Sequence, residues 1–508
     1  KSWLHDCESN HVFCRQRGNA QVQLPTRLIE IVDADTARLV ETAGQTGQYI
    51  ALSYCWGSEP GNNSMTLKAN LSERLESLPR DTLPGAIRDA VTIADRLGMK
   101  YIWVDALCMV QDDAQDKNVE LGNMSQYYRN SWLTIAASTS SCTTGFIGTT
   151  GRCENHPGNT LPRDLVPLNI PINKRAWTLQ EGILAPRVLL FGSRVIWFCQ
   201  HMTRKFQMEL SKLDTEVSNT STEPLRTAGL DEDQNIYDLW HRIVGSYSKR
   251  AVSYPQDKLP AISALAAEVS KLTKDEYLAG LWRSNLLRDL LWTTPEPTTH
   301  RPDEWRAPTW SWASINDAIL YDQLPPKSAT ALATVSDVAT SPISGTVPFG
   351  EVQSGRLVID APCSWIKFDK GDDPAKTAAP FLRGFGFKIG KNERESLFEM
   401  LKTQARPSWK DPEETDEKEK KGYQLPDNIT IAFMYGKRDD IVQPTDGDED
   451  SGEKDQHWTM WGLILKHVSG DVSQGDDGIL FERVMAFSQV PVGLEGGGLP
   501  PARRLHIV

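Results

Sequence analysis

Tryptophans stand close to charged or polar side chains in three short blocks of this chain. The blocks are Ala51–Gly57, Trp103–Asp113 and Arg175–Glu181. An acid or amide held against a tryptophan ring lies in a reduced dielectric, where its charge and its hydrogen bonds count for more. Three such blocks in one chain predict a single composite site.

Asp105 comes directly after the apolar stretch 101–104, which predicts a short buried strand. Ligands of open α/β sheets bind outside the carboxyl ends of the strands. This rule predicts that Asp105 lies at the site, together with Gln111 and Asp112. Two alternatives stay open: Asp105 only organises the site, and Asp112 and Asp113 cap the helix that follows.

The third block offers a cation, a flat apolar wall, an amide and a carboxylate. If the segment is helical, Trp177, Gln180 and Glu181 share one face, because residues three and four apart are neighbours on a helix. Arg175 can hold an anion or pair with a carboxylate by a two-pronged hydrogen bond. Glu181 can act as a general base or stabilise a cationic transition state. The alternative is a structural network of Arg175 with nearby carboxylates, among them Asp105, since such networks also perturb pKa values.

Cys108 lies three residues after Asp105 and offers a thiol to the same site. A catalytic thiol needs a neighbouring base, and no histidine falls in the three blocks. A buried structural thiol is therefore the favoured interpretation, and Cys108 stays a ligand-binding candidate only.

His5, Cys7, His11 and Cys14 form the pattern H-x-C-x3-H-x2-C near the N-terminus. Four nitrogen and sulfur ligands can bind zinc tetrahedrally. Because these spacings differ from those of the usual paired zinc knuckles, we predict no metal site.

The composition is that of an ordinary globular protein, with 508 residues, 39% of them hydrophobic and 24% charged. The net charge of −12 argues against a general nucleic-acid or anionic-membrane surface, because both need a positive field. No apolar run approaches the roughly 18 residues that span a bilayer. The eight cysteines do not make a disulfide scaffold, so we expect a reducing, cytoplasmic location, although five glycosylation sequons are a mild counter-signal.

Several common catalytic motifs are missing from the sequence. It has no Gly-rich dinucleotide fingerprint after a strand, no phosphate-binding loop, no nucleophile elbow and no His-Glu-x-x-His pair. Standard dinucleotide oxidoreductases, P-loop NTPases, α/β-hydrolases and zinc proteases are therefore disfavoured.

Alternating strands and helices must position the blocks. Strands are predicted at 28–32, 48–55, 101–104 and 132–137. Helices are predicted at 84–97 and 115–129, and Thr82 is expected to cap the first of them. The succession of strand and helix predicts a parallel α/β sheet. Later elements are a hairpin at 188–198, a mainly helical stretch at 234–292, and strands at 331–338, 356–361, 429–434, 458–466 and 480–487.

These elements predict four regions along the chain. They are a lead-in (1–46), an α/β core (47–200), a mainly helical region (201–320) that ends after Trp310-Ser311-Trp312, and a β-rich C-terminal region (321–508). Highly charged tracts near 409–422 and 445–455 interrupt the last region and are predicted to be mobile insertions, because they cannot bury enough apolar surface to order.

The three blocks resemble the motifs of the HET (heterokaryon incompatibility) domain of filamentous fungi. Ala51–Gly57 resembles its first motif, residues 83–113 its second, and Arg175–Glu181 its third. Two positions depart from the family pattern: Ala106 stands where Ser is frequent, and Lys117 where an aromatic residue is usual.

The resemblance extends over most of the chain. The lead-in Trp3-Leu4-x-x-Cys7-x3-His11-x2-Cys14 resembles the stretch that precedes the domain. Segments 254–261, 280–282 and 307–314 resemble a C-terminal region common to long members.

The resemblance implies an effector of non-self recognition or programmed cell death. HET domains have been likened to TIR domains, whose flavodoxin-like fold supports NAD cleavage in some members. A Rossmann-like or flavodoxin-like parallel core is thereby implied, with NAD as a substrate and no assigned cofactor. Glu181 or Glu120 would then stabilise the ribosyl cation, and Asp105 would organise the site. Trp56 or Trp177 would stack on a base.

The candidate residues follow from the blocks and the resemblance together. Catalytic candidates are Asp105, Glu120, Arg175 and Glu181, and ligand-binding candidates are Tyr54, Trp56, Cys108, Gln111, Asp112, Trp177 and Gln180.

Three functional hypotheses stay open. The first is an effector that binds a small-molecule or nucleotide ligand and hydrolyses NAD. The second is an enzyme of fungal specialised metabolism, a cyclase or dehydratase that works by cofactor-independent acid–base catalysis. The third is a non-enzymatic signalling module with a protein partner or self-association. None of the three involves nucleic acid or a membrane span.

Overall fold

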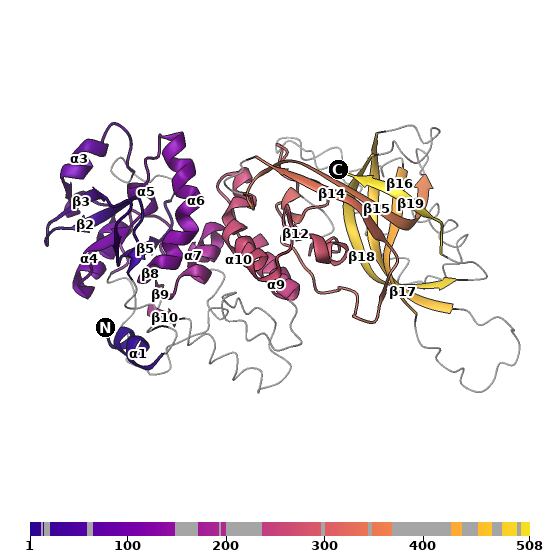
Figure 1. Ribbon diagram of the computed structural model, residues 1–508, viewed down its shortest axis with the longest axis horizontal. Helices are drawn as coiled ribbons and strands as arrows, with labels where there is room; N and C mark the ends of the chain where they lie inside the picture. The colour runs from indigo at the N-terminus through magenta and orange to yellow at the C-terminus, as the bar shows by residue number, and fades with distance from the viewer. Residues whose placement is uncertain are drawn as a thin grey trace, which may run out of the picture. The chain divides into compact units, whose positions relative to one another are not determined.

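The computed structural model describes two compact units, each with its own sheet (Figure 1). The first comprises Lys1–Ser253 with Ala261–Val269, and the second Tyr254–Pro260 with Ser270–Val508. The described residues are 1–11, 14, 21–57, 65–147, 171–192, 195–199, 236–295, 300–343, 348–367, 428–438, 456–469, 480–494 and 499–508. The charged tracts 409–422 and 445–455 lie outside them.

An eight-stranded mixed sheet organises the first unit. Its strands are, in spatial order, β10 (Val195–Cys199), β9 (Arg187–Phe191), β8 (Leu133–Ala137), β5 (Ile50–Ser53), β7 (Tyr101–Trp103), β2 (Arg27–Ile31), β3 (Thr36–Glu41) and β6 (Leu78–Pro79). β5 runs parallel to β7 and to β8, and β8 parallel to β9. The remaining pairs are antiparallel. The expected α/β class is confirmed. The neighbouring strands β9, β8, β5 and β7 are parallel, and the antiparallel strands on either side make the sheet mixed.

A tight turn explains the antiparallel pairing of β2 with β3. The Asp33 carboxylate accepts hydrogen bonds from the backbone N–H groups of Asp35 (2.9 Å) and Thr36 (2.8 Å). Such a turn reverses the chain within a few residues, whereas parallel neighbours need a long crossover. The sequence patterns predicted β2 but not β3.

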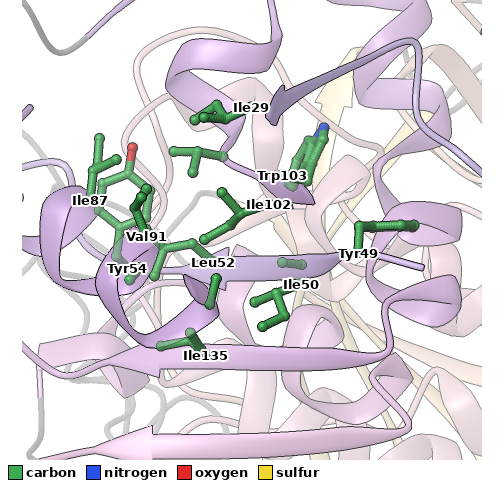
Figure 2. Packing of buried hydrophobic residues seen from close by; sticks show 14 of the residues in the cluster. Ile29, Tyr49, Ile50, Leu52, Tyr54, Ile87, Val91, Ile102, Trp103 and Ile135 are labelled. Atoms are coloured by element: carbon green, nitrogen blue, oxygen red, sulfur yellow. The ribbon is translucent and has the colours of Figure 1, made fainter. Parts of the chain in front are cut away.

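Helices pack against both faces of the sheet, because successive strand side chains point to opposite faces. On one face, Leu52 and Ile102 lie with Ile87 of α4 (Gly85–Leu97), as Figure 2 shows. On the other face, Trp103 packs on Tyr127 of α6 (Ala114–Asn130), with ring centroids 5.3 Å apart. The alternation of β5 thus sends Ser53 toward the face opposite Leu52.

The ends of α4 agree with the prediction in part. The helix ends at Leu97, as predicted, and Gly98 follows in the left-handed conformation at φ +80°. Thr82 was predicted to cap the helix and does not: its hydroxyl donates to the carbonyl of Pro79, and Pro84 occupies the N-cap position. Thr82 instead belongs to a separate short 3-10 turn, η1 (Arg80–Thr82).

Asp113 caps α6. The sequence had left this role open as one of two interpretations. The Oδ1 of Asp113 accepts from the backbone N–H groups of Gln115 (3.0 Å) and Asp116 (3.2 Å). We expect Asp113→Ala to lower the free energy of unfolding, because two N–H groups lose their acceptor. Asp113→Asn should recover most of this, since Asn also caps. Urea unfolding of the three proteins tests it, and equal losses in both variants would contradict the capping role.

The remaining elements of the first unit are short or lie toward its ends. They are α1 (Ser2–Asn10), β1 (Val22–Gln23), β4 (Thr46–Gly47), α3 (Leu71–Glu76), α5 (Asp105–Cys108), η3 (Pro171–Lys174), α7 (Trp177–Leu184) and α9 (Ile236–Ser248). Helix α10 (Ser263–Thr273) begins in this unit, where Glu268 pairs with Arg129 of α6. Within the described residues, no helix is both long enough and apolar enough to cross a membrane.

The second unit is rich in β-structure, as predicted. Its large sheet has the order β13 (Thr330–Ala331), β16 (Asn428–Arg438), β17 (Gln456–Ser469), β18 (Leu480–Leu494), β19 (Ala502–Ile507), β15 (Val352–Lys367) and β14 (Thr334–Pro342). β15 also pairs with β16, so the order closes on itself. The sequence patterns missed β19. Shorter elements are η5 (Pro255–Lys258), η6 (Pro260–Ile262), β11 (Tyr277–Leu278), β12 (Leu281–Trp282), η7 (Arg283–Asn285), α11 (Leu286–Asp289) and η8 (Trp312–Ser314).

Candidate functional site

The fold brings the three tryptophan-containing blocks together around the ends of β5 and β7. The hydroxyl of Ser53, the last residue of β5, donates to Oε2 of Glu181 on α7. The guanidinium of Arg175 donates to the carbonyl of Tyr54. Trp56 Nε1 donates to Asp105 Oδ2 over 2.9 Å, so each block contacts another.

Asp105 follows β7 and opens the short helix α5. Its Oδ1 accepts from the backbone N–H of Ala106 (2.7 Å), and its Oδ2 from Trp56. Burial raises the pKa of the Asp105 carboxyl, while Arg175, Trp56 and the Tyr54 hydroxyl stabilise the carboxylate and act against that rise. The residue is half-buried.

Gly57 fixes the backbone beside Trp56. Its φ of +86° is unfavourable for other residues, and an added Cβ would lie 2.6 Å from the Ser141 hydroxyl oxygen. The backbone N–H of Cys142 donates to the carbonyl of Trp56 over 3.3 Å, which holds the two loops together. The Trp56 ring itself is half-buried.

Glu181 lies deeper than Asp105, with 4% of its surface exposed. Burial raises the pKa of Glu181 to about 7, although Arg175 and the hydrogen bond from Ser53 favour the charged form. Asp105 raises the pKa further, whereas a hydrogen bond with the Tyr128 hydroxyl lowers it. A carboxyl with a pKa near neutrality can both accept and donate a proton at physiological pH.

Two guanidinium groups balance the two carboxyls. Burial acts to lower the pKa of Arg175, but the carboxylates of Glu181 and Asp105 outweigh it and leave that pKa raised. Arg250 donates from Nη1 to the carbonyl of Arg175 (3.3 Å) and to Thr178 Oγ1 (3.1 Å). Burial lowers the pKa of Arg250 to about 10, with Glu181 acting against this change. The cluster is therefore a nearly charge-balanced set in a low dielectric.

Sequence reasoning missed three members of this cluster: Ser53, Tyr128 and Arg250. Ser53 stands inside the first block but was given no role. Tyr128, whose hydroxyl donates to the carbonyl of Leu52 (3.0 Å), lies on α6, outside the three blocks. Arg250 follows α9 and belongs to none of the three blocks, so no sequence signal could have found it.

Other predicted site residues support the surrounding backbone. Gln111 Nε2 donates to the carbonyls of Asp105 (3.1 Å) and Met109 (3.4 Å), which braces the turn after β7. Asp112 is exposed and accepts from the backbone N–H of Lys68 (2.8 Å).

Trp177 and Gln180 both lie on α7. Trp177 begins the helix, is half-buried and packs against the main core cluster. Gln180 is buried, and its Oε1 has no hydrogen-bond partner among the described residues. Glu181 follows on the same helix, so the expected helical spacing of the third block is present.

The hydrogen-bond partners of Glu120 and Cys108 are not those of Glu181. Burial raises the pKa of Glu120, and hydrogen bonds with Thr26 and Tyr127 favour its charged form. Cys108 is fully buried, burial raises its thiol pKa to about 12, and its Sγ accepts from the backbone N–H of Val104 (3.4 Å). A thiol so placed is not ionised at neutral pH and is a poor nucleophile.

Comparison with known proteins assigns a family to part of the chain. The family described as heterokaryon incompatibility protein (HET) matches residues 49–163. This range covers the first and second blocks, and the third, at 175–181, lies beyond it. No curated protein and no solved structure matches the chain.

Proposed function

We propose, from its membership of the heterokaryon incompatibility (HET) family through residues 49–163, that this chain is a fungal effector of non-self recognition and cell death. Its working site would be the cluster of Trp56, Asp105, Arg175 and Glu181. The observation that carries the proposal is a pair of carboxyls that share one guanidinium beside a half-buried tryptophan.

This cluster suits a ligand with a flat ring and a group that becomes cationic. The half-buried rings of Trp56 and Trp177 offer stacking surfaces. Asp105 offers a carboxylate that a ligand can approach, because it keeps part of its surface exposed. A nucleotide that carries nicotinamide meets both requirements, and a flavodoxin-like arrangement of the TIR type is consistent with such chemistry.

The proposed reaction is hydrolysis of NAD. The bond between the nicotinamide nitrogen and the ribose C1′ breaks, and its electron pair leaves with nicotinamide. The ribosyl cation that forms is stabilised by the Asp105 carboxylate. Water adds to C1′ and loses a proton, which Glu181 accepts, because the pKa of about 7 leaves part of Glu181 ionised at neutral pH.

Release of nicotinamide from NAD by the full-length purified protein tests this reaction. We expect Asp105→Asn and Glu181→Gln to lower the rate about a hundredfold or more. Asp81→Asn, which removes an exposed carboxyl in η1, serves as the matched control and should leave the rate unchanged. Absence of nicotinamide release by the wild type, with cell toxicity intact in Glu181→Gln, would contradict the proposed reaction.

A second candidate is a non-enzymatic signalling module, in which the cluster only stabilises the fold. The mutual contacts favour it, because Ser53 and Arg175 already satisfy groups on other blocks. Under this candidate, loss of toxicity in Asp105→Asn tracks loss of folding, as measured by thermal unfolding. Under the enzymatic proposal, toxicity is lost while the unfolding temperature stays close to that of the wild type.

A further inference from the structure

We propose that the first unit carries a structural zinc site formed by Cys7, His11, Cys14 and Cys199. All four side chains are buried, and their potential ligand atoms lie within 4.8 Å of one another. No role in the site around Glu181 involves them. The pattern of His5, Cys7, His11 and Cys14 was predicted to bind no metal, because its spacings differ from those of the usual paired zinc knuckles.

The fold replaces one ligand of that sequence pattern. His5 is exposed on α1 and does not join the cluster. Cys199, at the end of β10, takes its place from 188 residues beyond His11. Because the fourth ligand is far away in the chain, the spacing of the N-terminal residues could not reveal the complete set of ligands.

The local backbone explains how Cys7 and His11 converge. Cys7 lies on α1. His11, four positions later, is the C-cap residue that directly follows the helix. Side chains four residues apart lie on the same side of a helix. The backbone N–H of His11 donates to the carbonyl of Cys7 over 3.3 Å, which retains this relation at the helix end.

The distance between His11 and Cys199 matches tetrahedral zinc coordination. His11 Nδ1 and Cys199 Sγ lie 3.4 Å apart. Zinc bonds of about 2.3 Å to sulfur and 2.0–2.1 Å to nitrogen, at tetrahedral angles, place two such ligand atoms about 3.5 Å apart. The other ring nitrogen, Nε2, lies 3.8 Å from Asp6 Oδ2. A carboxylate on the distal nitrogen is the arrangement that commonly orients histidine ligands of metals.

The surrounding charge also suits a thiolate-bound cation. Zinc with three thiolates and one neutral imidazole carries a net charge of −1. Arg187, with 1% of its surface exposed, pairs in β9 with Cys199 of β10 and donates from Nη2 to the carbonyl of Cys14 (2.9 Å). A buried guanidinium next to the cluster compensates that charge.

The three thiols need a cation before they can ionise. All three thiols are buried, and a buried thiolate without a cation is unfavourable. Zinc binding replaces the thiol protons and so removes this penalty. The consequence is a cross-link between the N-terminal helix and the β9–β10 hairpin.

Metal analysis of the full-length protein, expressed with zinc and purified without chelator, tests the site. We expect about one zinc per chain, and loss of the metal in His11→Ala and in Cys199→Ser. His5→Ala, the matched histidine on the same helix, and Cys363→Ala, a buried thiol in the second unit, should retain it.

Cobalt substitution supplies a readout that does not depend on the folding of the variants. Co²⁺ loaded into the wild-type protein should give the intense visible bands of tetrahedral thiolate coordination, and Cys14→His should retain metal with one thiolate fewer. Three results would overturn the proposal: a wild-type protein without stoichiometric zinc, unchanged zinc content in Cys199→Ser, or a disulfide among Cys7, Cys14 and Cys199 in mass spectra of the native protein.

Discussion

Glu181 should make the wild-type protein less stable as the pH rises from about 4.5 to about 7. The variant Glu181→Gln should not show this pH dependence. The ordinary pKa of 4.5 applies to the unfolded chain, and burial raises the pKa of Glu181 to about 7 in the folded state. Between these values the folded protein holds a proton that the unfolded chain has lost. Raising the pH therefore destabilises the fold. The full effect is about 3 kcal/mol, at 1.36 kcal/mol for each pKa unit.

Glutamine mimics the protonated carboxyl and carries no charge, so its stability contribution does not change with pH. We expect the variant to equal the wild type near pH 4 and to exceed it above pH 7. Urea unfolding at pH 4, 5.5, 7 and 8 measures the difference between the two proteins. Glu73→Gln, an exposed glutamate on α3, is the control and should run parallel to the wild type. A constant difference between Glu181→Gln and wild type across this range would contradict the proposed titration.

Arg175→Met should destabilise the first unit. The methionine keeps much of the apolar stem but leaves Glu181 and Asp105 without their shared cation. The loss should stay below the roughly 3–5 kcal/mol typical of a broken buried ion pair, because Arg175 acts on the two carboxylates through its charge and not through a direct salt bridge. The cost should be greater at pH 8 than at pH 5, since protonation of the carboxyls relieves it.

Two further variants separate this charge effect from the loss of packing. Arg175→Lys retains the charge but loses the planar fork that donates to the carbonyl of Tyr54, so an intermediate loss is expected. The double variant Arg175→Met with Glu181→Gln should be more stable at pH 8 than the sum of the two single effects predicts, because the charges of Arg175 and Glu181 are coupled. Additive effects, measured by urea unfolding at pH 8, would show that Arg175 acts through packing alone.

Local sequence determined the elements that carry the first two blocks. The apolar run before Asp105 predicted β7, and the helix predicted at 84–97 is α4. The sequence offered Asp112 and Asp113 as caps of the next helix, and Asp113 is the N-cap of α6. These features depend on backbone hydrogen bonds and side-chain periodicity within a few residues, which one chain segment contains in full.

Long-range pairing could not be read from the same patterns. Strand β3 has little apolar surface, with only Ala37 and Leu39 buried, so it lacks a strong strand signal. The antiparallel β2–β3 pair depends on a turn built around Asp33. The register of such pairs is set by which side chains can share a face, and that is a property of two segments together.

The candidate site divides in the same way. The sequence by itself determined that Asp105 follows a buried strand and that Trp177, Gln180 and Glu181 lie on one helix. Only the tertiary structure decided that Glu181 meets Ser53, that Arg250 joins the cluster, and that Cys199 rather than His5 completes the cysteine and histidine cluster. The physical reason is that burial and charge at a site are summed over segments far apart in the chain, and no local spacing encodes that sum.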